Sequence, residues 1–460
     1  MSPSPLSPLP SLSPPAPSHS HCHPRFHGAL AQVRANLLPA WRRRDGRAAG
    51  RTACVIAAWL VCHAAQAITP LALPQGEHGV EGNVAIVRDG TVMRIVQTGE
   101  HGIVDWRSFD IGRDALVQVR QPSSQATLLN RVVGATTSDI AGSLEANGRI
   151  YLVNPNGITI SSGGSISAAA FVASTLDLAN SDFLAGLPRF TASAPPAAGT
   201  IGHAGRIMVE AGGFVALLGH RIVQSGAIYA PQGRVGLGAG ASAGLTPHGR
   251  TLLSLQPAAE RAGGGEAAIV MAGTIEADGG LVQMSAPFGA AAGAAPGEAV
   301  NLGGLVRARA LAGRPGTISI EGDGGVVRLS GVLNASSNVP GVAHLMGGAV
   351  QVNGRRVLME RGEIDVSGAL GGGSVQLAAR TLDEIGGAPS PGGACDPLLF
   401  VGATSRLDAS ATWHGPGGEL TLESDGKAVF LGSAQARGAV MTTAPAAAAA
   451  PVPPPSAGSR

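Results

Sequence analysis

The feature that most constrains the fold is a short unit that recurs along the chain. It has the form Gly-x-Ile-x-Ala, followed by a glycine-containing turn and then Val-x-Leu or Val-x-Met. In two copies the isoleucine and the valine are seven residues apart, Ile228 from Val235 and Ile275 from Val282. Looser copies occupy 331–335, 362–366 with 375–377, and 406–409 with 420–422. A unit repeated in this way predicts a repeat architecture.

Each unit predicts two short strands, because apolar residues alternate with other residues on either side of a glycine turn. A strand of three to five residues buries too little surface to be stable alone, so the units must stack. We therefore predict an all-β right-handed parallel β-helix of about 20 residues per rung, with Val, Ile and Leu inside and Glu, Arg and Gln outside. Only 3% of residues are aromatic, which favours this narrow solenoid over the alternative of an all-β propeller or sandwich.

The N-terminal 67 residues have the pattern of a presequence with a signal peptide. A basic segment at 40–51 leads into the apolar segment 52–62, and Ala65-Gln66-Ala67 matches a signal-peptidase site. We expect cleavage after Ala67; the alternatives are a buried core helix and a retained anchor. Removing 1–67 would lower the net charge from +2 to near −4, which argues against nucleic acid as a partner.

Cysteine usage agrees with export. Cys22, Cys54 and Cys62 lie in the presequence, which leaves Cys395 alone in the mature chain and excludes an internal disulfide. We interpret Cys395 as an incidental thiol in a loop. The histidine cluster at 19–23 lies in the part predicted to be removed, so we expect no metal site and no cofactor.

Residues 68 to about 190 carry five blocks in a fixed order. They are His101-Gly-Ile-Val-Asp-Trp-Arg-Ser-Phe-Asp-Ile-Gly112, Leu128-Leu-Asn-Arg-Val-Val-Gly134, Ile140-Ala-Gly-Ser-Leu-Glu-Ala-Asn-Gly148, Val153-Asn-Pro-Asn-Gly-Ile158 and Val172-Ala-Ser-Thr-Leu-Asp177. In this order they resemble the N-terminal secretion domain of filamentous-haemagglutinin-like exoproteins, which are exported by two-partner secretion. The resemblance implies a domain that caps the β-helix and is recognised by an outer-membrane transporter of the Omp85 class. The Asn-Pro-Asn-Leu block of some family members is absent here.

The fourth block combines residues that favour a tight turn. Proline fixes φ near −65°, while asparagine and glycine accept positive φ. Such a turn can make a corner of the solenoid, can contact a partner, or can do both. By the resemblance, the secretion-motif residues are Asn154, Pro155, Asn156 and Gly157, and less firmly Asn130 and Arg131.

The resemblance also divides the chain and suggests its role. We expect a secretion domain over 68–190, β-helical repeats over 191–440 and a disordered Ala/Pro-rich tail over 441–460. The implied function is that of a secreted or surface-exposed adhesin, with a host cell-surface receptor or carbohydrate as its further partner. Binding of a host protein such as a haem carrier is the alternative. The tail argues against the C-terminal barrel of an autotransporter.

Parallel β-helices also include polysaccharide-active enzymes, which need clustered carboxylates. The acids here are mostly single: Asp105, Asp110, Asp114, Asp177 and Asp182. The histidines of the mature chain are scattered: His78, His101, His203, His220, His248, His344 and His414. We therefore expect no catalytic residues and no enzymatic activity, and keep a polysaccharide-active enzyme as the weaker alternative.

Overall fold

The computed structural model describes residues 68–192, 199–249, 251–257, 266–288, 297–311, 313–337, 346–380 and 398–439. The predicted signal peptide, Cys395 and the tail over 441–460 lie outside the described residues.

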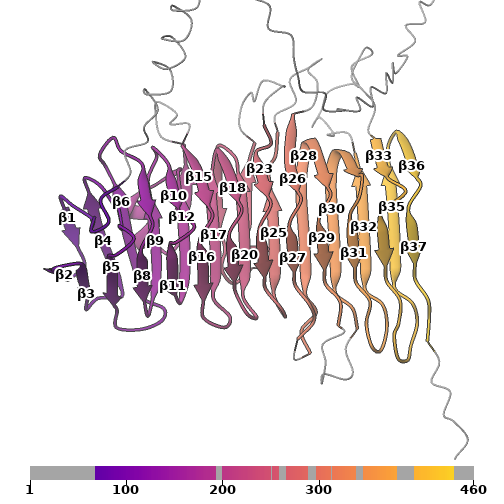
Figure 1. The fold of residues 1–460 in the computed structure, drawn as a ribbon, viewed down its shortest axis with the longest axis horizontal. Helices are drawn as coiled ribbons and strands as arrows, with labels where there is room; N and C mark the ends of the chain where they lie inside the picture. Colours follow the sequence, from indigo (N-terminus) through magenta and orange to yellow (C-terminus); the bar gives the residue numbers. More distant parts are fainter. Residues whose placement is uncertain are drawn as a thin grey trace, which may run out of the picture. The chain divides into compact units, whose positions relative to one another are not determined.

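The described chain coils into a parallel β-helix with three strands in most rungs (Figure 1). One strand of each rung belongs to a 13-stranded sheet, and the other two belong to a 20-stranded sheet. The 13-stranded sheet contains β2 (Val84–Asp89), β3 (Val92–Gln97), β5 (Leu116–Arg120), β8 (Ser143–Ala146), β11 (Ser165–Ala168), β16 (Arg206–Val209), β19 (Ala227–Tyr229), β24 (Thr274–Glu276), β27 (Leu305–Arg307), β29 (Val332–Asn334), β31 (Glu363–Asp365), β34 (Arg406–Asp408) and β37 (Ser433–Gln435). The fold class predicted from the repeats is confirmed.

The 20-stranded sheet turns the second and third sides of the rungs. It contains β1 (His78–Glu81), β4 (His101–Trp106), β6 (Thr127–Val132), β7 (Ser138–Ile140), β9 (Arg149–Val153), β10 (Ile158–Ile160), β12 (Ala170–Ser174), β15 (Thr200–His203), β17 (Phe214–Gly219), β18 (Arg221–Gln224), β20 (Arg234–Ala239), β23 (Ile269–Met271), β25 (Leu281–Ser285), β26 (Glu298–Leu302), β28 (Thr317–Leu329), β30 (Ala349–Met359), β32 (Ser374–Ala379), β33 (Leu398–Val401), β35 (Glu419–Ser424) and β36 (Lys427–Phe430).

The register follows the sequence repeat. Ile228 pairs with Ile275 in the 13-stranded sheet, and Val235 pairs with Val282 in the 20-stranded sheet, so the equal seven-residue spacing confirms that the two copies occupy equivalent positions. The rung length is less regular than predicted. Ile207 pairs with Ile228, 21 residues later, but Ile228 reaches Ile275 only after 47 residues, because a hairpin is inserted between them.

Glycines stack on one another at a corner that runs along the solenoid. A Cβ on Gly226 would lie 2.2 Å from the carbonyl oxygen of Gly205, and one on Gly273 would lie 2.1 Å from that of Gly226. Gly304 and Gly331 continue the column with the same close approach, 2.2 and 2.1 Å. A side chain here would push the rungs apart, which explains why 68 of the 460 residues are glycine.

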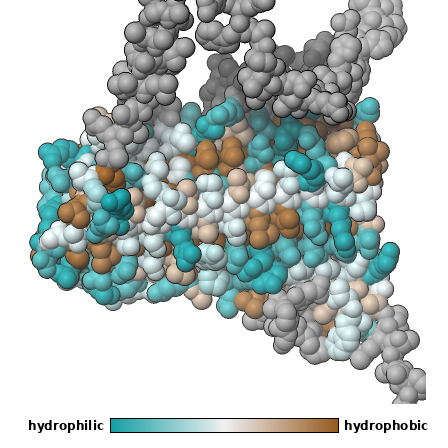
Figure 2. Space-filling model, viewed as in Figure 1, coloured by the Kyte–Doolittle hydropathy of each residue, from teal (hydrophilic) through white to brown (hydrophobic). Residues whose placement is uncertain are grey.

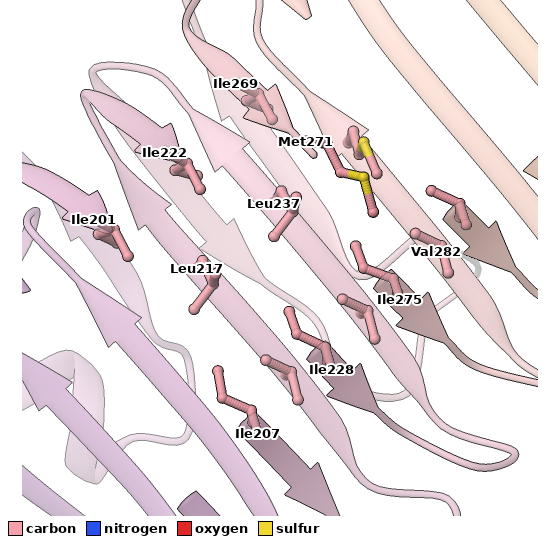
Figure 3. Packing of buried hydrophobic residues seen from close by; sticks show 14 of the residues in the cluster. Ile201, Ile207, Leu217, Ile222, Ile228, Leu237, Ile269, Met271, Ile275 and Val282 are labelled. Atoms are coloured by element: carbon pink, nitrogen blue, oxygen red, sulfur yellow. The ribbon is translucent and has the colours of Figure 1, made fainter. Parts of the chain in front are cut away.

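The main core is the interior of the β-helix. Isoleucine, leucine, valine and methionine side chains from successive rungs lie in columns, such as Ile207, Ile228 and Ile275 (Figure 3). Each of these three side chains is fully buried. Burying such a side chain contributes about 1.5–3 kcal/mol. On the outside, hydrophobic residues lie among hydrophilic ones on the face shown in Figure 2.

A second core lies on the outer surface of the 20-stranded sheet. It is covered by a four-stranded antiparallel sheet with a short helix, made of β13 (Asp177–Leu178), α2 (Asn180–Leu184), β14 (Arg189–Thr191), β21 (Ser242–Leu245) and β22 (Leu253–Gln256). Phe183 and Tyr151 meet edge to face with ring centroids 5.6 Å apart. Burial raises the pKa of Tyr151 to about 12.

This outer sheet overturns one expectation about the surface. Gln283 was predicted to face solvent, yet its side chain is buried beneath the hairpin β21–β22. Its amide accepts from the backbone N–H groups of Leu252 at 3.0 Å and Leu253 at 2.9 Å, and donates to the Leu253 carbonyl at 3.0 Å. The prediction failed because the repeat unit does not reveal that an inserted segment covers the outer face at this rung.

The first rungs are closed by antiparallel strands. β1 pairs antiparallel with β4, and β2 pairs antiparallel with β3 at the end of the 13-stranded sheet. Hydrogen bonding then continues through the predicted boundary at residue 190, since β10 pairs with β15 and β12 pairs with β17. The boundary itself stays a prediction.

Candidate functional site

The sequence blocks lie above one another in the fold. β4, β6, β9 and β12 are neighbours in the 20-stranded sheet and come from four of the five blocks, while the Ile140–Gly148 block supplies β8 of the 13-stranded sheet. Arg131 of β6 pairs with Val153 of β9, and the Asn154–Gly157 turn follows Val153 directly. The structure therefore brings all six predicted secretion-motif residues into two adjacent rungs.

The turn at 154–157 forms the corner between β9 and β10. Asn154 Oδ1 accepts from the backbone N–H of Asn156 at 3.0 Å, and the backbone N–H of Gly157 donates to the Asn154 carbonyl at 3.1 Å. Gly157 has φ +130°, a conformation that favours glycine. Asn156 does not use its tolerance of positive φ. The predicted tight turn is present, with glycine alone in the unusual conformation.

The two asparagine side chains join this corner to the rung before it. Asn154 Nδ2 donates to the Thr136 carbonyl at 3.0 Å and to Ser138 Oγ at 2.9 Å. Asn156 Nδ2 donates to the Gly134 carbonyl at 2.8 Å. The Asn154 side chain is fully buried, so a partner of the folded protein cannot touch it. Sequence reasoning did not identify the acceptors, because they lie between the recognised blocks.

The next rung closes the corner from its other side. A Cβ on Gly199 would lie 2.3 Å from the Pro155 carbonyl oxygen and 2.9 Å from the Gly157 nitrogen. Pro155 and Asn156 are half-buried, whereas Asn154 and Gly157 are buried. Within the corner, only these two half-buried residues offer side-chain surface to a partner.

Asn130 is also a buried structural residue. It lies on β6 with 1% of its surface exposed, and its Oδ1 accepts from the indole Nε1–H of Trp106 at 3.1 Å. Trp106 packs edge to face against Phe109, with ring centroids 5.6 Å apart. A buried indole N–H needs a hydrogen-bond partner. Asn130 supplies it from the neighbouring rung.

Arg131 points outward from the same strand and holds the outer sheet. Its guanidinium lies 3.3 Å from Asp105 Oδ1 and 3.4 Å from Asp177 Oδ1. It also donates to Asn180 Oδ1 at 2.7 Å and to the Leu178 carbonyl. These contacts join β6 to the segment that contains β13 and α2.

The chemistry of the site is structural. Burial raises the pKa of Asp110, although its carboxylate accepts from the backbone N–H of Asp139 at 2.9 Å. In the described part of the chain, no group of three or more His, Cys, Asp or Glu residues could hold a metal ion. No helix among the described residues is long and apolar enough to cross a membrane.

A β-helix with closed first rungs and an outer antiparallel sheet defines a class of secretion domain. The fold is similar to the HMW1 secretion domain from Haemophilus influenzae, with a TM-score of 0.67 and 25% identity over 80% of this chain and 91% of that domain. The sequence model of the TPS (two-partner secretion) domain family matches residues 71–335. The chain belongs to this family, which confirms the resemblance seen in the sequence. TPS exoproteins are secreted through the outer membrane with the help of a transporter partner.

Two relatives carry the name heme/hemopexin-binding protein. One, from Haemophilus influenzae strain Rd, is 42% identical over 106 residues, which is 23% of this chain and 12% of the relative. The other, from Haemophilus influenzae, is 43% identical over 116 residues, which is 25% of this chain and 12% of the relative. The matches therefore span about an eighth of the length of these relatives.

Proposed function

We propose that this protein is a secreted, adhesin-like exoprotein whose N-terminal rungs are recognised by an outer-membrane transporter. The observation that carries the proposal is the family match over residues 71–335 together with the stacking of the five blocks in the first rungs. The acidic mature chain and the presequence predicted at 1–67 support export.

We infer that Asn154 serves export by building the corner and not by touching the transporter. Its side chain is fully buried and its amide hydrogen is used on Thr136 and Ser138 of the preceding rung. Pro155 and Asn156 are half-buried and offer the accessible surface of the same turn. The domain read by the transporter is thus a surface whose shape depends on buried polar contacts.

The test is export of the full chain in cells with and without the cognate transporter. We expect the mature product in the medium or on the cell surface only when the transporter is present. Asn154→Ala should abolish release, while the control Asn334→Ala, which alters an asparagine turn in a later rung, should be released normally. Release without the transporter would contradict the proposal, and equal loss in both variants would contradict the special role of Asn154.

A second candidate function is binding of a haem carrier. It is favoured by the printed names of the two relatives, although the matched segment is 12% of each. Purified chain tested by calorimetry against hemopexin, and separately against haem, separates this function from adhesion to cells. Saturable binding would support the second candidate, and adhesion without it would support the first.

A further inference from the structure

The last described rung leaves its apolar layer open. Its strands β35, β36 and β37 pair with β32, β33 and β34 of the rung before, and among the described residues nothing pairs with their other edges. Leu422 is 38% exposed and Phe430 is 41% exposed. The residues directly beneath them, Leu377 and Val401, are fully buried.

An open strand edge beside exposed apolar side chains is a surface that pairs with other strands. Antiparallel pairs at the first rungs cover the opposite end of the solenoid, where β1 lies on β4. The open end is therefore a single surface at one side of the described unit. It consists of the free edges of β35, β36 and β37, and we call it the terminal edge.

We propose that the terminal edge binds the terminal edge of a second copy of this chain, end to end, about a two-fold axis. A two-fold axis perpendicular to the solenoid reverses the direction of every strand, so the strands of the two copies meet antiparallel. If the axis passes through β37 and between β35 and β36, then β35 of each copy pairs with β36 of the other, and β37 pairs with itself.

The sequence of the edge is self-complementary in this arrangement. With Glu423 opposite Lys427 of the second copy, Leu422 comes opposite Ala428 and Leu420 comes opposite Phe430. Directly opposite residues in an antiparallel pair lie on the same face. The charged pair is then on the outer face, and the apolar pairs are on the core face, since Leu420, Leu422, Ala428 and Phe430 stack on the core residues Val375, Leu377, Leu399 and Val401.

The third strand fits the same axis. With Ala434 of β37 opposite its own copy, Ser433 comes opposite Gln435. Ala434 stacks on the buried Leu407, so this self-pair also faces the core. All three strands are thereby paired at once, and because the interface is the same on both copies, the assembly closes at two.

One existing contact must be compatible with the pairing. Glu423 forms an ion pair with Arg380 of the same chain, and its side chain remains 42% exposed. A carboxylate has two oxygens and accepts more than one donor. Glu423 can therefore bind Lys427 of the second copy while it keeps Arg380.

The experiment is sedimentation equilibrium of the purified full chain. We expect a monomer–dimer equilibrium, with no species larger than a dimer. Phe430→Asp should raise the dissociation constant about 100-fold, because it places a charge in the centre of the interface. The control Val87→Asp alters another exposed apolar residue on an edge strand, at the opposite end of the unit, and should leave the dimer unchanged. A wild-type monomer at about 100 µM, or a dimer insensitive to Phe430→Asp, would overturn the proposal.

Charge exchange tests the register even if Phe430→Asp fails to fold. Glu423→Lys should weaken the dimer about tenfold. The double variant Glu423→Lys with Lys427→Glu should restore wild-type affinity, because the opposite pair is re-formed with its signs exchanged. Failure of the double variant to recover, with circular dichroism unchanged, would show that the two residues do not face each other.

Lys427 is the only lysine of the chain, which gives a direct chemical probe. A carbodiimide should join its amine to Glu423 of the second copy, and the product can be read by mass spectrometry of a mixture of ¹⁴N and ¹⁵N chains. A mixed-isotope peptide that contains both residues supports the proposal. A mixed-isotope link from Lys427 to an acid outside the terminal edge would overturn it. Neither result depends on export.

Discussion

Buried polar side chains distinguish two regions of the solenoid. Up to Ser285, the described interior and the layer under the outer sheet contain buried glutamine, asparagine, threonine and histidine: Gln97, Gln121, Thr127, Asn130, Asn154, Thr175, His203, Gln224 and Gln283. From residue 297 onward, the buried polar residues of the described chain are all serines: Ser336, Ser337, Ser367 and Ser405. The rungs have the same backbone geometry in both regions, so the difference lies in what fixes one rung against the next.

In the first region, polar side chains connect one rung to another or to the outer sheet. Asn154 reaches Thr136, Trp106 reaches Asn130, and Gln283 reaches Leu253. A hydrogen bond inside a low-dielectric core demands its partner at a set position, because an unpaired buried group costs about 1–3 kcal/mol. The first region therefore has its register specified by polar contacts, whereas the second depends on apolar columns and stacked glycines.

The same turn chemistry is used differently in the two regions. Asn334, Asp365 and Asp408 each accept from the backbone N–H two residues ahead, at 3.1, 2.9 and 3.0 Å, as Asn154 does. These three bonds stay within a single turn. Asn154 adds donors to the preceding rung, so its removal should disturb two rungs and theirs only one.

The largest expected effect is that of Asn154→Ala on stability. The variant leaves the Thr136 carbonyl, Ser138 Oγ and the Asn156 N–H without their partner in a buried site, so we expect a loss of about 3 kcal/mol in the free energy of unfolding. Asn334→Ala is the matched control and should cost about 1 kcal/mol, since one exchangeable turn bond is lost. Urea denaturation followed by circular dichroism measures both. Equal losses would remove the distinction between the two regions.

The next effect concerns one column of the 20-stranded sheet. Gln283 pairs with Ser319, which in turn pairs with Gln351, but Gln283 is covered by the outer sheet and Gln351 is exposed. Gln283→Leu should cost about 2 kcal/mol, because it leaves backbone groups of Leu252 and Leu253 unpaired. Gln351→Leu, at the equivalent exposed position, should change stability by less than about 0.5 kcal/mol.

Hydrogen exchange locates the effect of Gln283→Leu. The amides of Leu252 and Leu253 should lose protection, and those of the neighbouring strand β25 should keep it. Uniform loss along the solenoid would instead indicate that the glutamine stabilises the rung itself and not the hairpin above it.

The repeats predicted the fold well because they report directly on packing. Ile228 and Ile275, or Val235 and Val282, recur at equal spacing since each must fill the same place in successive rungs. The inserted segments could not be predicted in the same way. Nothing in the alternation of residues 281–285 indicates that a hairpin forty residues earlier in the chain folds back over Gln283, since that contact depends on tertiary packing.

The candidate site was predicted in part. The turn chemistry of Asn154–Gly157 indicated a corner, and the corner is present. That the amides are buried and bound to the preceding rung could not be inferred, because the acceptors at Gly134 and Thr136 are backbone carbonyls, which carry no sequence signal. Whether the six secretion-motif residues act in export stays a prediction.

The smallest effect sharpens the contrast at the point where the polar interior meets the next rungs. His203 is 1% exposed, and its strand neighbours at the same position are Ile160 and Gln224. Burial lowers the pKa of His203 to about 4. In the unfolded chain a histidine has a pKa of about 6.5. The unfolded state therefore binds the proton more readily, so stability is full above pH 6.5 and decreases as the pH falls toward 4.

Between pH 7 and pH 5.5 this difference corresponds to about 1 kcal/mol in the free energy of unfolding. His203→Gln should remove that part of the pH dependence, because glutamine fills a similar position without titrating. His248→Gln is the control, since His248 lies exposed in the turn between β21 and β22 and its replacement should leave the pH profile unchanged. Urea titrations at the two pH values measure all three chains. If the His203→Gln profile parallels that of the wild type, the interior of the first region tolerates a charge at this position, and its polar contacts specify register less strictly than the buried asparagines indicate.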